Sequence, residues 1–385
     1  MSVSGRPIRV LHLLKTSVGA TWALRQVREL VRLGVEVHVA LPEGPLVAHY
    51  KAAGVHVHLA RFDFPVQTLW RAPGIIAGLR HLVHTVQPDL IHSHFVGTTL
   101  TMRLALGRVG RIPRIFQVPG PLHLESPFFR RAELAVAGPA DYWIGSCRWT
   151  CAAYQAMGVA RKHVFLSYYG TDVEDFVRGR GGKLRTEPGI VPGRPIVGMV
   201  AYMYGPKWVL GQKRGLKGHE DLIDALRIVI DSGLDLQAVF VGGAWNGAHD
   251  YERRVRAYGH ERLGERAVFL GTRNDVPDLY PDLDVVAHPS HSENVGGAAE
   301  SLLLGVPTVA TNVGGFPDVV VDGVSGWLVP PRDPPRLAAA ITAAIHDPVR
   351  ARVMAEHGSR RVRELFDVRV TAAQIADIYQ TILSA

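Results

Sequence analysis

The chain has 385 residues, of which 47% are hydrophobic and 20% charged, a balance typical of a globular protein of two or three domains. No apolar run approaches the roughly 20 residues that span a bilayer, and residues 1–7 lack the apolar core of a signal peptide, so we expect a cytoplasmic protein. The two cysteines, Cys147 and Cys151, indicate neither a disulfide framework nor a thiolate zinc site.

The formal net charge of +8 lies entirely in the first half of the sequence. Residues 1–175 hold 19 Lys+Arg against 11 Asp+Glu, which leaves +8, whereas residues 176–385 hold 24 of each sign. A localised basic surface indicates an anionic partner, such as a phosphorylated acceptor, a phospholipid surface or a nucleic acid. No interleaved run of aromatic and basic residues supports nucleic acid, so we expect none.

The first half alternates β-rich runs with helical patterns, which predicts a parallel sheet with helices on both faces. A helix is expected over residues 21–33, whose apolar residues recur every three or four positions. The strands predicted in this half are 9–14, 35–41, 55–60, 90–95, 114–118, 142–146 and 164–168.

Glycines and prolines interrupt the alternation in residues 176–195, which predicts an exposed linker. The strands predicted after it are 196–201, 237–241, 267–270, 284–287, 307–310 and 326–329, and helical patterns follow to residue 383. We therefore predict an α/β protein with two Rossmann-like domains, 1–175 and 196–365. Residues 366–385 are expected to form a C-terminal helix that packs back on the first domain.

The strongest candidate site follows the predicted strand 284–287. Glu293 stands in a loop, paired glycines follow at Gly296 and Gly297, and Glu300 lies near the start of a predicted helix. Glycines let the backbone approach a ligand, and a helix start presents free N–H groups and a positive dipole end. This pattern favours diphosphate binding, with the carboxylates available for hydroxyl groups. A glycine turn with a helix-capping glutamate is the alternative.

The segment 288–315 resembles the donor-site signature of glycosyltransferase family 4. In that family a loop glutamate and a helix glutamate precede a Gly-x-Pro segment and a Gly-Gly turn, matched here by Glu293, Glu300, 305–307 and 314–315. Six residues separate the two glutamates where the family usually has seven, which predicts a tighter loop. The resemblance implies the GT-B fold, in which two Rossmann-like domains face each other across a cleft, and retaining sugar transfer.

A lysine at a helix start is unfavourable for the dipole unless an anion lies nearby, and Lys217 precedes the helical run 220–230. The family has a Lys-Gly pair here, whose lysine neutralises the donor diphosphate. The arginine that usually precedes it is missing, and a segment carrying Lys207, Lys213 and Arg214 follows the strand 196–201 instead. Arg214 is the expected replacement, because a guanidinium binds phosphate in a bidentate way.

Three candidates come from the first half. Gly19 follows the first strand without a GxGxxG pattern; the resemblance places a turn there that closes over the donor phosphates. His92 and His94 share one face of a strand, and His94 stands at the carboxyl end, where sites lie and where the family commonly has a histidine near the transferred sugar. His123 is a candidate acceptor contact. No carboxylate cluster completes a metal site with the histidines, so neither a metal nor a cofactor is expected.

Taken together, the residues and the resemblance predict a metal-independent, retaining hexosyltransferase that acts in polysaccharide biosynthesis. The donor is a nucleotide diphosphate sugar, and the acceptor is a glycan, a lipid-linked carrier or a small molecule. Glu293, His94 and Lys217 are the expected catalytic residues. The residues expected to bind the donor are Gly19, Arg214, Thr272, Arg273, Asn294, Val295, Gly296, Gly297 and Glu300.

The basic first half further predicts peripheral contact with an anionic membrane at its inner face. Four arginines (Arg103, Arg108, Arg111 and Arg114) and the aromatic-basic run 128–131 are the candidates for this contact. Two other readings remain open: a sugar-nucleotide epimerase of GT-B type, which needs no acceptor, and a non-enzymatic protein that binds nucleotides or nucleic acid.

Overall fold

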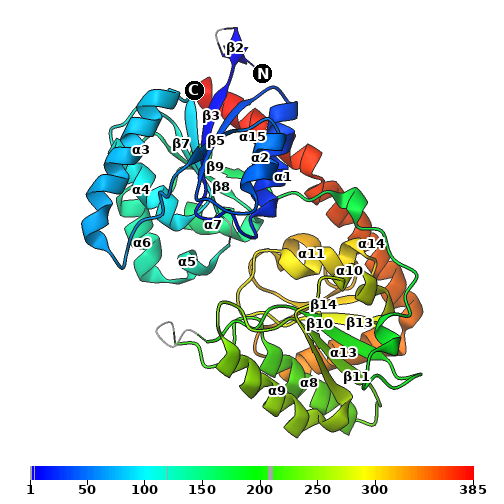
Figure 1. Cartoon of the computed structure of the whole chain (residues 1–385). Coiled ribbons are helices and arrows are strands. Elements are labelled where there is room, and N and C mark those ends of the chain that lie inside the picture. Colours follow the sequence, from blue (N-terminus) through cyan, green and yellow to red (C-terminus); the bar gives the residue numbers. More distant parts are fainter. Residues whose placement is uncertain (1, 4, 119, 207–210) are drawn as a thin grey trace. The chain divides into compact units, whose positions relative to one another are not determined.

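A computed structural model describes residues 2–3, 5–118, 120–206 and 211–385. The chain divides into two compact units. The first unit comprises Met1–Asp172 together with Leu365–Ala385, and the second unit comprises Val173–Glu364. Each unit contains its own parallel sheet, which confirms the prediction of two Rossmann-like units in series (Figure 1).

The first unit contains a seven-stranded, all-parallel sheet in the order β5-β4-β3-β6-β7-β8-β9. Its strands are β3 (Arg9–Leu13), β4 (Glu36–Leu41), β5 (His56–Leu59), β6 (Leu90–Ser93), β7 (Arg114–Val118), β8 (Asp141–Gly145) and β9 (Val164–Leu166). Two short strands, β1 (Ser2–Val3) and β2 (Arg6–Pro7), pair with each other before the sheet begins. The strand order reverses between β3 and β6, which is where ligands of such sheets bind.

Helices cover both faces of this sheet. Those of the first unit are α1 (Thr21–Arg32), α2 (Val47–Ala52), α3 (Ala72–Val86), α4 (Val96–Leu106), α5 (Leu122–Glu125), α6 (Pro127–Ala135), α7 (Arg148–Ala156) and α15 (Val368–Leu383). The last helix packs beside α1, and its buried residues Ile375 and Tyr379 join the same core as Val27 and Leu30 (Figure 1). The last helix therefore contributes to the core of the first unit.

The second unit contains a six-stranded parallel sheet in the order β12-β11-β10-β13-β14-β15. Its strands are β10 (Ile196–Val200), β11 (Gln237–Val241), β12 (Ala267–Gly271), β13 (Val285–His288), β14 (Thr308–Thr311) and β15 (Trp327–Val329). The order reverses between β10 and β13. The connections that follow these two strands therefore begin side by side at the carboxyl edge.

Two cores enclose the second sheet. One face packs against α8 (His219–Asp231), α9 (His249–Leu263) and α13 (Pro334–His346), and the other against α10 (Val276–Leu279) and residues preceding the unit's first strand (Figure 1). The remaining helices are α11 (Gly296–Leu303), α12 (Phe316–Val319) and α14 (Pro348–Phe366). Among the described residues, no helix combines the length and apolar character that a membrane span requires.

The segment 176–195 is mostly exposed, as its glycines and prolines predict, but it is also anchored to the second unit. Leu184 is fully buried in the core of the second unit. The carboxylate of Asp282 accepts hydrogen bonds from the backbone N–H groups of Gly182 and Leu184. Composition indicated the irregular backbone correctly, but the side chains between the glycines anchor this segment to the sheet of the second unit.

Candidate functional site

The edge where the second sheet reverses its order carries the residues of the candidate donor site. Lys217 lies in the connection between β10 and α8, and Glu293 lies in the connection between β13 and α11. Because β10 and β13 are neighbours in the sheet, both connections start at the same edge. The reversal of strand order therefore brings together two residues that are distant in sequence.

Close backbone contacts lock these two connections together. Gly218 has a φ of +74°, and a Cβ atom there would lie 2.0 Å from the carbonyl oxygen of Pro289. The backbone N–H of His291 donates to the carbonyl oxygen of Leu216 at 2.8 Å. A residue other than glycine at position 218 would push the connections apart, so Gly218 fixes the approach of Lys217 to Glu293.

Lys217 and Glu293 form an ion pair in which the lysine ammonium donates to the carboxylate. The ammonium also lies 5.6 Å from the ring centroid of Tyr204, a residue that the sequence argument did not single out. Burial would lower the pKa of Lys217, but the carboxylate of Glu293 outweighs burial and raises it. The lysine is therefore a fixed positive charge at neutral pH.

The start of α11 adjoins this ion pair. Gly296 has a φ of +21°, and a Cβ atom there would lie 3.5 Å from Oε1 of Glu293. At Gly297 a Cβ atom would lie 2.9 Å from the ring of His288, so a larger side chain does not fit without movement. Free N–H groups, a dipole end and a lysine cation thus lie together, and this arrangement suits an anion such as a diphosphate.

Further residues of the motif lie in this loop and at the start of α11. The backbone N–H of Asn294 donates to Oε1 of Glu293 at 3.1 Å, and Val295 is buried just before α11. Glu300 is exposed on the fifth residue of α11. The backbone N–H of Gly315, in the predicted Gly-Gly turn, lies 3.4 Å from the carbonyl oxygen of Glu293. The structure therefore brings Asn294, Gly296 and Gly315 of the motif against Glu293.

Arg214 lies in a different environment from Lys217. Its guanidinium is paired with Asp221 at 2.5 Å and with Asp224 at 2.7 Å. Burial would lower its pKa, but the two carboxylates outweigh burial and raise it. His291 also donates to Asp221, at 2.5 Å. Arg214 thus meets two carboxylates here, a feature that its position in the sequence did not indicate.

A cavity of about 420 Å³ lies beside Arg214 and its two aspartates. Its lining includes Lys213, His291 and Arg332. Lys213 is exposed. Lys207, the third cation of the segment, falls outside the described residues.

Thr272 and Arg273 follow β12, in the loop expected to receive the base. Thr272 is exposed. Arg273 forms ion pairs with Glu187 at 2.6 Å and with Asp275 at 2.7 Å. Arg273 therefore ties this loop to the segment that precedes β10, whereas Thr272 has solvent access.

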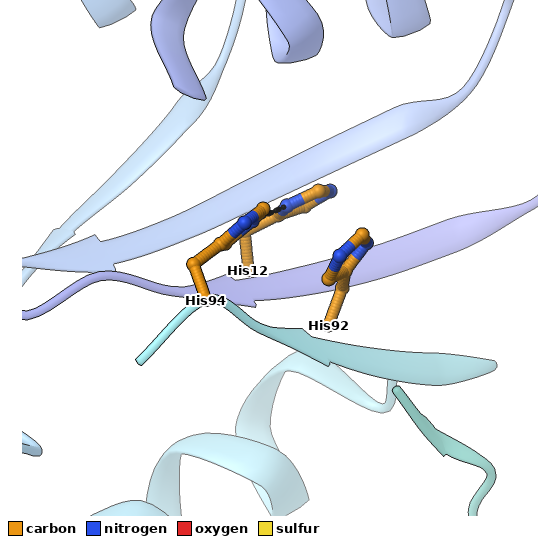
Figure 2. A group of neighbouring side chains, drawn as sticks. All are labelled: His12, His92 and His94. Carbon is orange, nitrogen blue, oxygen red and sulfur yellow. Dashed lines mark hydrogen bonds between the residues drawn. The ribbon is translucent and has the colours of Figure 1, made fainter. Parts of the chain in front are cut away.

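In the first unit, Gly19 and His94 follow the two strands between which the order reverses. Gly19 lies between β3 and α1 and has a φ of +69°, a conformation that favours glycine. His94 follows β6 and is fully buried. Nε2 of His94 lies 2.9 Å from Nδ1 of His12, and His92 lies alongside (Figure 2). Sequence reasoning missed His12, although a histidine inside the apolar run Val10–Leu14 was the available signal.

The hydrogen bonds in this cluster fix the protonation of each histidine ring. Tyr169 donates its hydroxyl proton to a backbone carbonyl at 3.1 Å, so it accepts from Nδ1–H of His94 at the same distance. Nε2 of His94 must then accept from Nδ1–H of His12. Nε2 of His12 accepts from Tyr379, which in turn accepts from Nδ1–H of His92 at 2.6 Å.

Two consequences follow from this chain of hydrogen bonds. Both ring nitrogens of His94 are engaged within the unit, and Nε2 of His92 is left without a hydrogen-bond partner among the described residues. Burial lowers the pKa of His12 to about 3 and lowers those of His92 and His94 well below the ordinary 6.5. The cluster is therefore neutral at physiological pH.

His123, the candidate acceptor contact, lies in α5. Its Nε2 is 3.2 Å from the hydroxyl of Tyr154, and its ring is 5.6 Å from that of Phe116. Burial lowers the pKa of His123, so this histidine is a neutral polar group at the edge of the core.

The structure corrects part of the expected basic surface. Arg103 and Arg114 are buried, at 2% and 0% exposure, and both pair with Asp141. Two of the four clustered arginines therefore stabilise the interior and do not face a partner, because sequence proximity does not reveal which side chains point inward. Arg108 and Arg111 are exposed.

The aromatic-basic run of α6 is at the surface. Phe128 is 72% exposed and Phe129 is 49% exposed, and Arg131 on the same helix is also exposed. This helix therefore presents both apolar and basic side chains to the outside of the first unit.

Comparisons with known proteins agree with this arrangement. Residues 209–361 match the family described as Glycosyl transferases group 1, and residues 19–175 match Glycosyltransferase Family 4. The chain is therefore a glycosyltransferase of the family 4 type.

The curated enzymes to which the chain is similar include a D-inositol 3-phosphate glycosyltransferase and a mannosyltransferase. The chain is 27% identical over 355 residues to the D-inositol 3-phosphate glycosyltransferase of Mycolicibacterium gilvum. This match covers 83% of this chain and 75% of that protein. The chain is 28% identical over 181 residues to the lipopolysaccharide core biosynthesis mannosyltransferase LpsB of Rhizobium meliloti. That match covers 45% of this chain and only half of that protein.

Among solved structures, the crystal structure of Anabaena Alr3699/HepE in complex with UDP-glucose is similar to this chain, with a TM-score of 0.78 and 25% identity. The match covers 96% of this chain and 98% of that one. This likeness confirms the predicted GT-B type of fold.

Proposed function

We propose that this glycosyltransferase transfers a hexosyl group from a UDP-sugar and retains the anomeric configuration. The observation that carries the proposal is the ion pair of Lys217 and Glu293 beside the start of α11. The pair puts a lysine cation and a carboxylate where the second sheet reverses its order, next to free N–H groups. The presence of UDP-glucose in the similar HepE structure supports uracil as the base of the donor nucleotide.

In the proposed reaction, the bond between the anomeric carbon and the donor diphosphate breaks, and negative charge grows on the leaving phosphate. Lys217 and the helix start would stabilise that charge, which is usually the largest catalytic contribution of such a site. When the diphosphate binds, it would compete with Glu293 for the ammonium. Glu293 would then be released to contact the transferred sugar, and Glu300 would accept hydrogen bonds from the ribose hydroxyls.

The lysine and the helix start supply the positive charge that a divalent cation supplies in other transferases. We therefore include metal-independent turnover in the proposal. Turnover that is unchanged by EDTA supports this part, whereas activity that EDTA abolishes and Mg²⁺ restores contradicts it.

The acceptor in this proposal is anionic and held at a membrane surface. The +8 excess in residues 1–175 and the exposed aromatic and basic side chains of α6 support this choice. The names of the two similar enzymes, one acting on an inositol phosphate and one in lipopolysaccharide core synthesis, also favour an anionic carrier.

A thermal-shift panel of UDP-, GDP- and ADP-sugars tests the donor. A ligand at about 100 times its dissociation constant stabilises a protein by roughly 2.7 kcal/mol, so the UDP-sugars should raise the melting temperature clearly. NMR of the product then reports the anomeric configuration. Stabilisation by GDP- or ADP-sugars instead of UDP-sugars contradicts the proposal, and so does a product with inverted anomeric configuration. Turnover of the donor without an acceptor favours an epimerase.

A further inference from the structure

A second histidine cluster lies at the edge of the first sheet and takes no part in the proposed transfer. Glu36 and His38 belong to β4, and His56 and His58 belong to the edge strand β5. His38 is paired in register with His56. Since alternate residues of neighbouring parallel strands share one face, the four side chains lie on the same side of the sheet.

The separations within this cluster suit a metal ion. Nε2 of His38 lies 3.1 Å from Oε1 of Glu36, close to the roughly 3.3 Å that joins two ligands of tetrahedral zinc with bonds of about 2.0–2.2 Å. One ligand atom each from Glu36, His38 and His56 lie within 4.8 Å of one another. Two imidazoles and one carboxylate form a ligand set that zinc uses in proteins.

We propose that Glu36, His38 and His56 bind a divalent transition-metal ion of the zinc class, with water as the fourth ligand. His58 is the positioning residue, because its Nε2 lies 2.9 Å from Nδ1 of His38 and orients that ring. A hydrogen bond at the second nitrogen is the usual support for a metal-binding histidine.

The exposed position of His56 gives a metal ion access to the site from solvent. His56 is exposed, whereas Glu36, His38 and His58 are half-buried. The rings of His38 and His56 are stacked 4.6 Å apart, so His56 must turn to direct its lone pair at the ion, and its solvent-facing position allows this movement.

Arg9 both supports and weakens this site. Its Nε donates to Oε1 of Glu36 at 2.6 Å, and its Nη1 donates to the carbonyl oxygen of Val86 at 2.9 Å. These bonds hold the carboxylate in place, but the guanidinium charge repels a cation. We therefore expect weaker binding than at a structural zinc site with four protein ligands.

The buried cluster of His12, His92 and His94 also brings three ring nitrogens within 4.8 Å, but it suits a cation less well. The three side chains are fully buried, and apart from Nε2 of His92 their ring nitrogens are engaged with one another or with Tyr169 and Tyr379. The rings are near-parallel in both clusters, at 14–25° here and at 22° between His38 and His56, but only His56 is exposed and can turn toward an ion. The group at the sheet edge has a carboxylate and solvent access, which the buried group lacks.

The test is calorimetric titration of the full, untagged and EDTA-stripped chain with ZnCl₂, followed by Co²⁺ absorption. We expect one ion per chain and the visible spectrum of four-coordinate Co²⁺. His56→Ala and Glu36→Gln should each weaken binding by about tenfold or more, since each removes a ligand. His84→Ala, which removes an exposed histidine of α3, should leave binding unchanged.

Comparison of the metal-free melting temperatures separates loss of a ligand from loss of fold, and the exposed His56 should be replaceable without a change. Absence of saturable binding overturns the proposal. So does a His56→Ala variant that binds Zn²⁺ as tightly as the parent chain, or binding that is lost only on His92→Gln, which would place the ion in the buried cluster.

Discussion

The ammonium of Lys217 contacts the carboxylate of Glu293, although the two residues are 76 positions apart. The contact depends on the neighbouring positions of β10 and β13 and on the absence of a side chain at Gly218. The ion pair keeps a cation and a carboxylate oriented at the start of α11. A diphosphate that binds there therefore meets a cation already in position.

Lys217→Ala should reduce turnover by about 10²-fold or more, the usual effect of removing one group that stabilises developing charge. It should also weaken binding of UDP more than binding of uridine, because only UDP carries the diphosphate. Steady-state kinetics and calorimetry measure the two effects. Lys213→Ala, which removes an exposed lysine four residues earlier, is the control, and a larger loss in that variant would reassign the phosphate contact.

Glu300→Gln should weaken UDP binding and leave the melting temperature unchanged, since Glu300 is exposed and is proposed to accept ribose hydroxyls. Calorimetric titration with UDP and with 2′-deoxy-UDP measures the effect, and the variant should discriminate less between them. Glu261→Gln, at an exposed position of α9, is the matched control. Unchanged affinity for UDP would remove Glu300 from the donor site.

Arg214→Gln should lower the free energy of unfolding by roughly 1–3 kcal/mol, because it leaves the carboxylate of Asp221 buried with one partner fewer. The two ion pairs favour this structural role over the phosphate contact expected from the sequence. Urea denaturation measures the change. Arg227→Gln, which breaks an exposed ion pair with Asp231 on α8, should cost much less. A stable Arg214→Gln variant that loses UDP affinity as Lys217→Ala does would restore the phosphate role.

Co-sedimentation with vesicles tests the proposed membrane contact. Binding should rise with the fraction of phosphatidylglycerol and fall with salt, since exposed charges are screened within about 8 Å at physiological ionic strength. Replacing Arg130 and Arg131 together by Ala should weaken binding by roughly 30-fold, at about 1 kcal/mol for each charge. Replacing Arg253 and Arg254 of α9 removes the same charge from the second unit and should change little. Equal binding to neutral vesicles would favour a soluble acceptor.

Stability should fall as the pH drops below 6.5. Burial lowers the pKa of His12 and His288 to about 3 and that of His219 to about 4. Between those values and 6.5 the unfolded chain takes up protons that the folded chain does not, so acid favours unfolding, by about 2 kcal/mol for each histidine at pH 5.

Urea denaturation at pH 7.5, 6 and 5 measures this loss of stability. His219→Gln, which cannot be protonated, should show a slope smaller by about 1.2 kcal/mol per pH unit between pH 6 and 5. An unchanged slope would mean that His219 is protonated in the folded chain as readily as in the unfolded one.

The alternation of strands and helices was readable from the sequence because buried parallel strands need continuous apolar runs and helices need apolar residues every three or four positions. The predicted strand 114–118 agrees with β7, and the strand 237–241 agrees with β11. The loop around Glu293 was also recognisable, since its glycines and glutamates are local in sequence. Strand ends elsewhere differ by one or two residues, because hydrogen bonding to neighbouring strands decides where a strand stops.

The sequence by itself determined the two parallel α/β units, the family resemblance and the residues of the donor motif, because all of these depend on local patterns. Only the tertiary structure decided which of the charged residues are already paired. It placed Arg103 and Arg114 in the core with Asp141, Arg214 between two aspartates, and Lys217 against Glu293. Ion pairs and buried hydrogen bonds form between elements far apart in the chain, so the order of strands in the sheet, and not the spacing of residues, selects the partners.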